Sequence, residues 1–409
     1  MKERWKRVRL REAAEIIMGQ SPKSEFYNTF GEGLPFFQGC SDFGELYPSP
    51  KTYCTKILRV AEKDDVLMSV RAPVGDLNIT KEKCIIGRGL CALQTKFENG
   101  RFLYYLIKSN VSKLISLETG AVYGAVNKTT IENLELKIPP LSTQRKIASI
   151  LSAYDDLIDN NMRRIKILEE MAQAIYKEWF VKFRFPGHEK VKMVKSELGM
   201  IPEGWEVKMV QDTFEITGGG TPSKKILEYW EGGNINWYVP SDLTAHRTMF
   251  MDESGEKISE LGLRKSSARL FPAYSVMMTS RATLGVISIN TTEACTNQGF
   301  ITCIPNEKFP LYTLYYWLHE NIEKFIRLGT GATFKEITKG VFKKIEIIVP
   351  REELLTEFEK GVTPINQQVL IFQRKSINLR KTRDLLLPKL ISGEIDVEKI
   401  DIEVNNLEV

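Results

Sequence analysis

Residues 141–185 read LSTQRKIASILSAYDDLIDNNMRRIKILEEMAQAIYKEWFVKFRF, and this stretch decides the fold. From Ile147 onward its seam positions are spaced by four and three residues in alternation, which is the heptad pattern of a coiled coil. The ten seam positions are Ile147, Leu151, Tyr154, Ile158, Asn161, Ile165, Leu168, Ala172, Ile175 and Trp179. Ser142 is a candidate N-cap and Pro186-Gly187 is a stop signal. We therefore expect one helix over 142–185, roughly 60 Å long at ~1.5 Å per residue.

A second seam lies 211 residues further along the chain. Its ten positions are Phe358, Val362, Ile365, Val369, Phe372, Ser376, Leu379, Arg383, Leu386 and Leu390, eight of them apolar. Pro364 should kink or delay this helix, because proline lacks the N–H that the helix needs. We interpret the two helices as an antiparallel intramolecular coiled coil between two globular domains, with Asn161 as a register-fixing polar position. The alternatives are that each helix packs only on its own domain and that Asn161 is an exposed, frayed position.

The chain repeats itself at an offset of 200 to 211 residues. The matching anchors keep one order: Trp5 and Trp205, Gly19 and Gly219, Ser21-Pro22 and Thr221-Pro222, Arg71 and Arg281, Gly75 and Gly285, Gly89 and Gly299, Pro139 and Pro350. In each half the first 140 or so residues hold short β-branched or aromatic runs broken by Gly, Pro, Asn and Asp, which is typical of a mixed domain with short strands. Residues 102–117 are the clearest helix in the first of these domains.

The predicted fold class is therefore α+β, with two homologous mixed α/β domains, two long helices and a pseudo-twofold internal repeat. The predicted segments are a first domain at 1–141, a central helix at 142–185, a linker at 186–204, a second domain at 205–350, a distal helix at 351–391 and an acidic tail at 392–409.

Composition narrows the function classes. The 409 residues are 43% hydrophobic and 27% charged, as in an ordinary folded protein, and no apolar run approaches the roughly 18 residues of a membrane span. We expect a cytoplasmic protein with no membrane partner. The net charge is +5, although residues 392–409 carry six acidic side chains and one basic one, so the rest of the chain is mildly basic. This balance is compatible with an anionic partner and equally with an ordinary solvated surface.

Several chemistries lack their residues. The six cysteines and three histidines never cluster with zinc-ligand spacing, so we expect no metal site. Pro139-Pro140 is the only Pro-Pro pair and lacks the flanking amide and aromatic of an adenine methyltransferase, and no phosphate-binding GxxxxGK[ST] loop occurs. The carboxylate–lysine pair of Glu206 and Lys208 has no upstream Pro-Asp and is best explained by chance. We therefore expect a non-catalytic chain.

Polar, basic and amide side chains lie in loop contexts beside Gly or Pro in both halves. Arg and Gln can read guanine and adenine edges, and Lys neutralises phosphate. The DNA-binding candidates are Gln20, Ser21, Lys23, Arg71, Arg88, Tyr123 and Lys128 in the first half, and Thr221, Ser223, Lys224, Lys225, Arg264, Lys265, Arg281, Gln298 and Lys335 in the second. Arg71 and Arg281 are the strongest pair, because each lies four residues before a glycine in an otherwise apolar strand. Their partner could be a phosphate, a base or a carboxylate of the same domain.

The helices carry a family resemblance. Pro139-Pro-Leu-Ser-Thr-Gln-Arg-Lys-Ile147, followed by Trp179-Phe-Val-Lys-Phe-Arg-Phe-Pro-Gly187, resembles the central spacer of the specificity (HsdS) subunit of type I restriction-modification systems. The segment Leu386-Leu-Pro-Lys-Leu-Ile-Ser-Gly-Glu394 is similar to the distal spacer of that family, and the Ser/Thr-Pro loops are similar to its target-recognition domains. Leu355 stands where the family has a glutamine matching Gln144, which leaves the start of the second helix open.

The resemblance implies a division of labour. Each target-recognition domain would read one half of a bipartite, asymmetric site on double-stranded DNA, and the helices would set a fixed gap. Two modification (HsdM) subunits would supply S-adenosylmethionine and methylate adenine, and two restriction (HsdR) subunits would supply the ATP- and Mg-dependent nuclease. No cofactor is then expected in this chain.

Two other classes stay open. A two-headed coiled-coil scaffold that binds proteins would show little of the steep salt dependence of DNA binding. A nuclease or methyltransferase with an unrecognised site would turn over alone with Mg²⁺ or a methyl donor.

Overall fold

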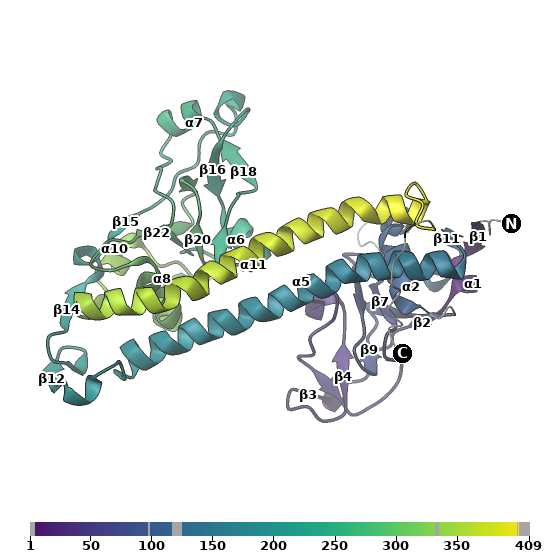
Figure 1. The fold of residues 1–409 in the computed structure, drawn as a ribbon, viewed down its shortest axis with the longest axis horizontal. Helices are drawn as coiled ribbons and strands as arrows, with labels where there is room; N and C mark the ends of the chain where they lie inside the picture. Colours follow the sequence, from purple (N-terminus) through teal and green to yellow (C-terminus); the bar gives the residue numbers. More distant parts are fainter. Residues whose placement is uncertain (1–4, 97–98, 117–124, 332–334, 399, 401–409) are drawn as a thin grey trace. The chain divides into compact units, whose positions relative to one another are not determined.

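The computed structural model describes residues 5–96, 99–116, 125–331, 335–398 and 400. The chain forms two compact units, of which unit 1 is Met1–Asn161 with Lys375–Val409 and unit 2 is Met162–Arg374. The two long helices, α5 (Leu141–Tyr176) and α11 (Glu352–Ser392), each contribute residues to both units (Figure 1). None of the helices in the described ranges is long and apolar enough to cross a membrane.

Unit 1 is built on a four-stranded antiparallel main sheet. Beside it lies a second sheet, called the smaller sheet because its five strands are on average shorter, and a strand pair joins the two ends of the domain. The main sheet has the order β2 (Ala14–Met18), β10 (Leu90–Thr95), β7 (Val66–Ser69), β8 (Leu77–Ile79). The smaller sheet has the order β3 (Tyr27–Asn28), β5 (Tyr53–Cys54), β4 (Leu34–Phe37), β9 (Cys84–Ile86), β6 (Val60–Ala61). The pair is β1 (Lys6–Arg9) with β11 (Glu135–Ile138). The short helices are α1 (Leu10–Ala13), α2 (Gly100–Lys108), α3 (Val111–Ser116) and α4 (Lys128–Glu132).

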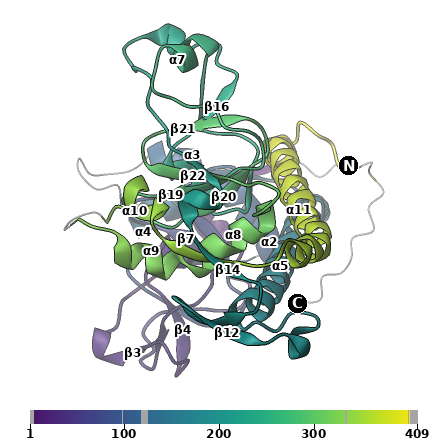
Figure 2. The same cartoon turned by 90° about the vertical axis from the view of Figure 1, so that its left-hand side faces the viewer.

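Unit 2 repeats this plan with two differences: a fifth strand, β17 (Phe250–Met251), pairs in parallel at the end of its main sheet, and its smaller sheet has three strands. Its main sheet has the order β15 (Glu215–Thr217), β22 (Phe300–Ile304), β19 (Val276–Thr279), β20 (Ile287–Asn290), β17. The smaller sheet is β18 (Glu256–Ile258), β16 (Ile235–Tyr238), β21 (Ala294–Thr296), and β14 (Glu206–Met209) pairs with β23 (Glu346–Val349). The helices are α6 (Pro240–His246), α7 (Glu260–Arg264), α8 (Leu311–Glu320), α9 (Ile322–Leu328) and α10 (Lys339–Lys343). In Figure 2 the strand β16 and helix α7 of unit 2 lie beyond its main sheet.

The strand pairing confirms the internal repeat. Lys6 pairs with Ile138 and Glu206 pairs with Val349, so the first partners differ by 200 residues and the second by 211. Each of the two smaller sheets contains one parallel pair among the described strands, and the two pairs are equivalent in the repeat: β4 with β9 and β16 with β21. The predicted fold class, two homologous α/β domains with two long helices, is therefore confirmed.

Helices α5 and α11 are antiparallel within each unit. In unit 2 Arg164 lies over the ring of Phe372, and Tyr176 contacts Phe358. Residues later in α5 therefore contact residues earlier in α11. In unit 1 Asp155 pairs with Arg383. All twenty predicted seam positions are buried or half-buried, Asn161 included, as expected for a heptad seam.

Three local features differ from the expectations. Helix α11 runs unbroken from Glu352 to Ser392, so Pro364 does not delay it, and Leu355 is buried in its first turns. The central helix ends earlier than predicted, with a π-helical turn at Lys177–Val181 and a positive φ of 57° at Phe183. The predicted linker at 186–204 contains a hairpin, β12 (Met193–Ser196) with β13 (Gly199–Pro202).

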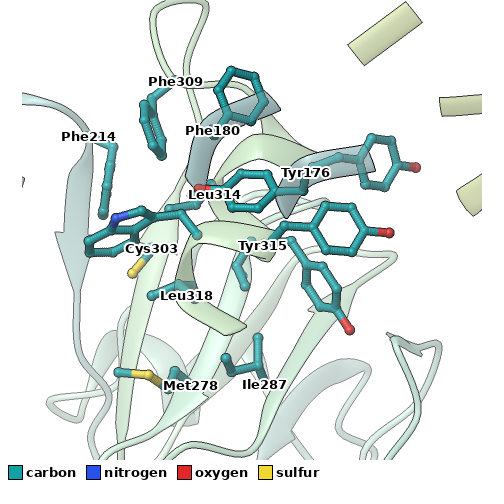
Figure 3. Packing of buried hydrophobic residues seen from close by; sticks show 14 of the residues in the cluster. Tyr176, Phe180, Phe214, Met278, Ile287, Cys303, Phe309, Leu314, Tyr315 and Leu318 are labelled. Atoms are coloured by element: carbon teal, nitrogen blue, oxygen red, sulfur yellow. The ribbon is translucent and has the colours of Figure 1, made fainter. Parts of the chain in front are cut away.

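The core of unit 2 lies between its main sheet and its helices. Figure 3 shows Leu314, Tyr315 and Leu318 of α8 among Met278 and Ile287 of the sheet and the aromatic rings of Tyr176 and Phe180. The equivalent core of unit 1 includes residues of the chain end, because Val397 is buried there. Lys146 donates hydrogen bonds to the carbonyl oxygens of Glu398 and Ile400, so the described part of the acidic tail packs on α5.

Candidate nucleic-acid interface

In unit 1 the loops that carry the predicted DNA-binding residues meet at one edge of the main sheet. The Ser21 hydroxyl donates to Gln38 Oε1 at 2.9 Å and accepts from the backbone N–H of Arg88 at 3.1 Å. The Val70 N–H donates to the Gly89 carbonyl, and the Val126 N–H donates to the Val70 carbonyl. We call this the loop edge of unit 1, formed by residues 19–22, 38–39, 70–71, 87–89 and 125–128.

Unit 2 has the equivalent loop edge, formed by residues 219–222, 239–240, 280–281, 297–299 and 335–338. The Thr221 hydroxyl donates to Gln298 Oε1 at 2.7 Å. The Ser280 N–H donates to the Gly299 carbonyl, and the Ile337 N–H donates to the Ser280 carbonyl. The same backbone connections thus hold both edges together, while the side chains on them differ.

Glycine makes the closest approach in each edge possible. A Cβ on Gly19 would lie 2.1 Å from the carbonyl oxygen of Gly87, and one on Gly219 would lie 1.9 Å from the carbonyl oxygen of Thr296. No side chain fits at such distances from backbone. The glycines that the repeat comparison singled out therefore allow the Ser/Thr-Pro loops to cross the loop before β10 or β22.

Arg71 and Arg281 occupy equivalent places on the two edges. Each follows a strand whose last residue, Ser69 or Thr279, binds the loop beyond through its hydroxyl: Ser69 accepts from the Asp76 N–H at 2.8 Å and Thr279 from the Val286 N–H at 2.9 Å. Both arginine side chains are exposed.

The partners of the two arginines differ. Arg281 forms a bidentate ion pair with Glu336, with Nε to Oε2 at 3.0 Å and Nη2 to Oε1 at 3.1 Å. Of the three partners predicted as alternatives, the carboxylate of the same domain is thus present for Arg281. Arg71 pairs through its backbone with Ala125, at the place that Glu336 has in unit 2.

Most of the other candidates lie on or next to the edges. Exposed side chains on or beside them are Gln20, Lys23, Arg88, Lys128, Thr221, Ser223, Gln298 and Lys335, and Ser21 is half-buried. Tyr27 lies beside the loop edge of unit 1 and donates its hydroxyl proton to the Pro22 carbonyl at 2.7 Å, and burial raises the pKa of this phenol.

Other candidates lie elsewhere. The Lys224 ammonium lies 3.6 Å from the ring centre of Trp230 and also near Trp237, and it forms an ion pair with Glu256. The partners of its charge therefore lie within unit 2. Arg264 is the last residue of α7 and Lys265 follows it, two residues before Ser267, whose backbone lies against Gly220 of the loop edge. Lys225 is exposed in the loop beyond Ser223. Tyr123 lies outside the described residues.

Sequence reasoning missed two residues of this region. Gln38 accepts the Ser21 hydrogen bond, and Glu336 holds Arg281. The repeat alignment at the same offset of 211 residues places Glu336 against Ala125 of the first half, but it does not indicate that Glu336 pairs with Arg281. Among the residues that the structure describes, no group of three or more His, Cys, Asp or Glu side chains could hold a metal ion.

A family model described as the type I restriction modification DNA specificity domain matches this chain twice, at residues 2–170 and 202–371. The two matches coincide with the two halves of the internal repeat.

Similar proteins cover nearly the whole chain. The type I restriction enzyme MjaIX specificity subunit of Methanocaldococcus jannaschii is 26% identical over 418 residues, which are 97% of this chain and 94% of that protein. The HindI specificity subunit of Haemophilus influenzae is 27% identical over 357 residues, 72% of this chain and 77% of that protein. The crystal structure of a type I S subunit from M. genitalium has a TM-score of 0.59 at 16% identity, covers 95% of this chain and 96% of its own, and supports the fold alone.

Proposed function

This chain belongs to the family of type I restriction-modification DNA specificity subunits, and from that premise we propose that its two units read the two halves of a bipartite, asymmetric DNA site with a fixed gap. The loop edge of unit 1 would contact one half-site and that of unit 2 the other. The chain itself would be non-catalytic and would direct adenine methylation or restriction by partner subunits.

One observation carries this proposal: the same backbone frame presents different side chains in the two units. Arg88 of unit 1 corresponds to Gln298 of unit 2, and Ala125 corresponds to Glu336. Arginine suits the O6 and N7 atoms of guanine, whereas glutamine suits the N6 and N7 atoms of adenine. Two equal frames with unequal side chains favour two half-sites of different sequence.

The helices support the fixed gap. A heptad seam holds α5 and α11 in one register, and a helix rises ~1.5 Å per residue, so the seam length would set a distance along DNA. Deleting one heptad from both helices removes about 10.5 Å, or about three base pairs at 3.4 Å each. We expect the deletion to shorten the tolerated gap by about that number, and an unchanged gap would show that the helices do not measure it.

The partners and cofactors follow the same premise. Two modification subunits would carry S-adenosylmethionine and the methylating site, and two restriction subunits would carry the ATP- and Mg-dependent motor and nuclease. The complex would act on cytoplasmic double-stranded DNA, with no cofactor bound by this chain.

The direct test is a methylome of DNA modified by this chain together with its modification subunit. We expect a two-part adenine-methylated motif with one gap length, and no motif when this chain is omitted. Replacing residues 1–141 by the first domain of another family member should change one half of the motif only. If the pair assembles, and the modification subunit works with another specificity subunit, a lack of new methylation would refute the proposal.

A further inference from the structure

We propose that Glu336 is a positioning residue that holds the Arg281 guanidinium side-on, so that its other edge can read a guanine in the second half-site. The inference rests on the proposed function and adds to it a specific base and a pair of residues. Glu336 does not contact the DNA in this arrangement. It fixes the direction in which Arg281 points.

The geometry of the ion pair leaves the required donors free. Glu336 accepts from Nε and Nη2 of Arg281, at 3.0 and 3.1 Å. A guanidinium has five N–H groups in a planar fork and stays charged at every relevant pH. Two N–H groups serve the carboxylate, so both N–H groups of Nη1 and one of Nη2 are left. The remaining Nη2 N–H and one of the two Nη1 N–H groups point side by side from the end of the fork, and this pair of donors matches O6 and N7 of guanine.

The backbone on both sides of the pair is tied down. Arg281 and Glu336 face each other in an antiparallel bridge, and Glu336 also exchanges two backbone hydrogen bonds with Thr330, at 2.8 and 3.0 Å. Ile337 donates to the Ser280 carbonyl at 3.0 Å, one residue before Arg281. The two side chains therefore start from fixed points, and the ion pair fixes the remaining torsions of the arginine.

The exposure of the pair separates an orienting role from a stabilising one. The Arg281 side chain is 56% exposed and that of Glu336 is 35% exposed. An ion pair this open adds little to folding stability, because water competes for both charges. An arginine held in one conformation loses less rotamer freedom when it binds, so its discrimination between bases increases.

Unit 1 provides the internal comparison. The equivalent of Glu336 is Ala125, and among the residues that the structure describes Arg71 has no side-chain partner. Two arginines at equivalent positions thus differ in one property, the presence of a carboxylate that orients the guanidinium. A carboxylate on an edge that faces DNA repels the phosphates, so Glu336 would not be expected there unless it acts on Arg281.

The test measures discrimination base by base, on the complex of this chain with its modification subunit. Competition binding against DNA with every single substitution in the second half-site is compared for the wild type, Arg281→Ala, Glu336→Gln and Glu336→Ala. We expect Arg281→Ala to reduce discrimination at one guanine by roughly 5- to 150-fold, and both Glu336 variants to reduce it at that same guanine by roughly two- to tenfold. Glu206→Gln is the matched control, because it removes an exposed, lysine-paired carboxylate of unit 2 from strand β14, and its profile should equal the wild type.

Three outcomes would overturn the inference. Tighter binding of the Glu336 variants to all sequences, with discrimination unchanged, would make the carboxylate a mask of Arg281. An equal loss at all sequences in Arg281→Ala, with a lower salt slope, would make Arg281 a phosphate contact. Losses at different positions in the Arg281 and Glu336 variants would separate the two residues. Failure of the proposed function would appear differently, as a wild-type complex without any two-part motif, and thermal unfolding verifies that each variant is folded.

Discussion

Replacing Arg383 by alanine should destabilise unit 1 by about 3–5 kcal/mol, because it leaves a buried carboxylate without its cation. Arg383 of α11 pairs with Asp155 of α5, and their side chains are only 5% and 1% exposed. Tyr105 donates its hydroxyl proton to the same carboxylate, and Glu45 accepts from Arg383 at 3.3 Å. The network joins both helices to the domain core.

The equivalent positions in unit 2 show how the penalty can be relieved. They hold Asn366 and Ala172, both fully buried, and Tyr316 donates to the Asn366 amide oxygen at 2.7 Å. A neutral amide is therefore compatible with this fold at the position of Asp155. We expect the double variant Asp155→Asn/Arg383→Ala to be at least about 2 kcal/mol more stable than Arg383→Ala alone, because no buried charge is then unpaired.

The assay is urea unfolding of the whole chain, followed by hydrogen exchange of α2 for unit 1 and of α8 for unit 2. Two units need two local probes, since a single two-state free energy does not describe them. Arg383→Ala should raise exchange in α2 and leave α8 nearly unchanged. Equal destabilisation by the single and the double variant would refute the reasoning, because it would place the cost in lost packing of the arginine stem.

Three further substitutions concern unit 2. Gly361 lies in α11 with open space where a Cβ would be added, so Gly361→Ala should raise the free energy of unfolding by about 0.5–1 kcal/mol. A Cβ at Gly219 would lie 1.9 Å from a carbonyl oxygen, so Gly219→Ala should lower the free energy of unfolding by about 3 kcal/mol. Thermal unfolding measures both effects. Burial raises the pKa of Glu169 to about 7, so the contribution of Glu169 to stability falls as the pH rises from about 4.5 to 7. Burial lowers the pKa of His319 to about 4, so the contribution of His319 to stability falls as the pH drops from about 6.5 to 4. Glu169→Gln should therefore stabilise unit 2 by about 1–2 kcal/mol at pH 8 and not at pH 4 in urea unfolding; a gain that is equal at both pH values would contradict this.

The sequence was sufficient for the features that repeat or alternate. The heptad spacing identified the buried positions of both long helices. Side chains of a coiled-coil helix return to the same side about every 3.5 residues, whatever the partner that packs there. The repeat offsets identified Gly19 and Gly219 as equivalent, and both prove to be sites of close backbone approach. These features follow from local spacing or from the internal repeat, without knowledge of which residues contact one another in the folded chain.

Features that depend on a tertiary partner or a single side chain were missed. The helix predicted over 102–117 is two helices, α2 and α3, because the Asn110 amide donates to the Leu106 carbonyl and the chain turns there. Pro364 is accommodated without a break, since a long helix packed along its length outweighs one missing hydrogen bond. The Arg281–Glu336 pair joins residues 55 positions apart, and no local spacing reveals such a partner.

The buried charges also explain why α5 pairs with α11 rather than with another copy of itself. Both helices descend from one repeat, so an antiparallel pair of two α5 helices would have the same seam spacing. It would place Asp155 opposite Ala172, and the carboxylate would be buried without a cation. A pair of two α11 helices would place Arg383 opposite Asn366, so the guanidinium would lose Asp155 and keep Asp384 of its own helix. A buried carboxylate without a cation costs several kcal/mol at each of the two symmetric contacts of an α5 pair, whereas the pairing within one chain gives both charges a partner. A buried charged residue thus selects the partner helix, as a single buried polar residue does in other coiled coils.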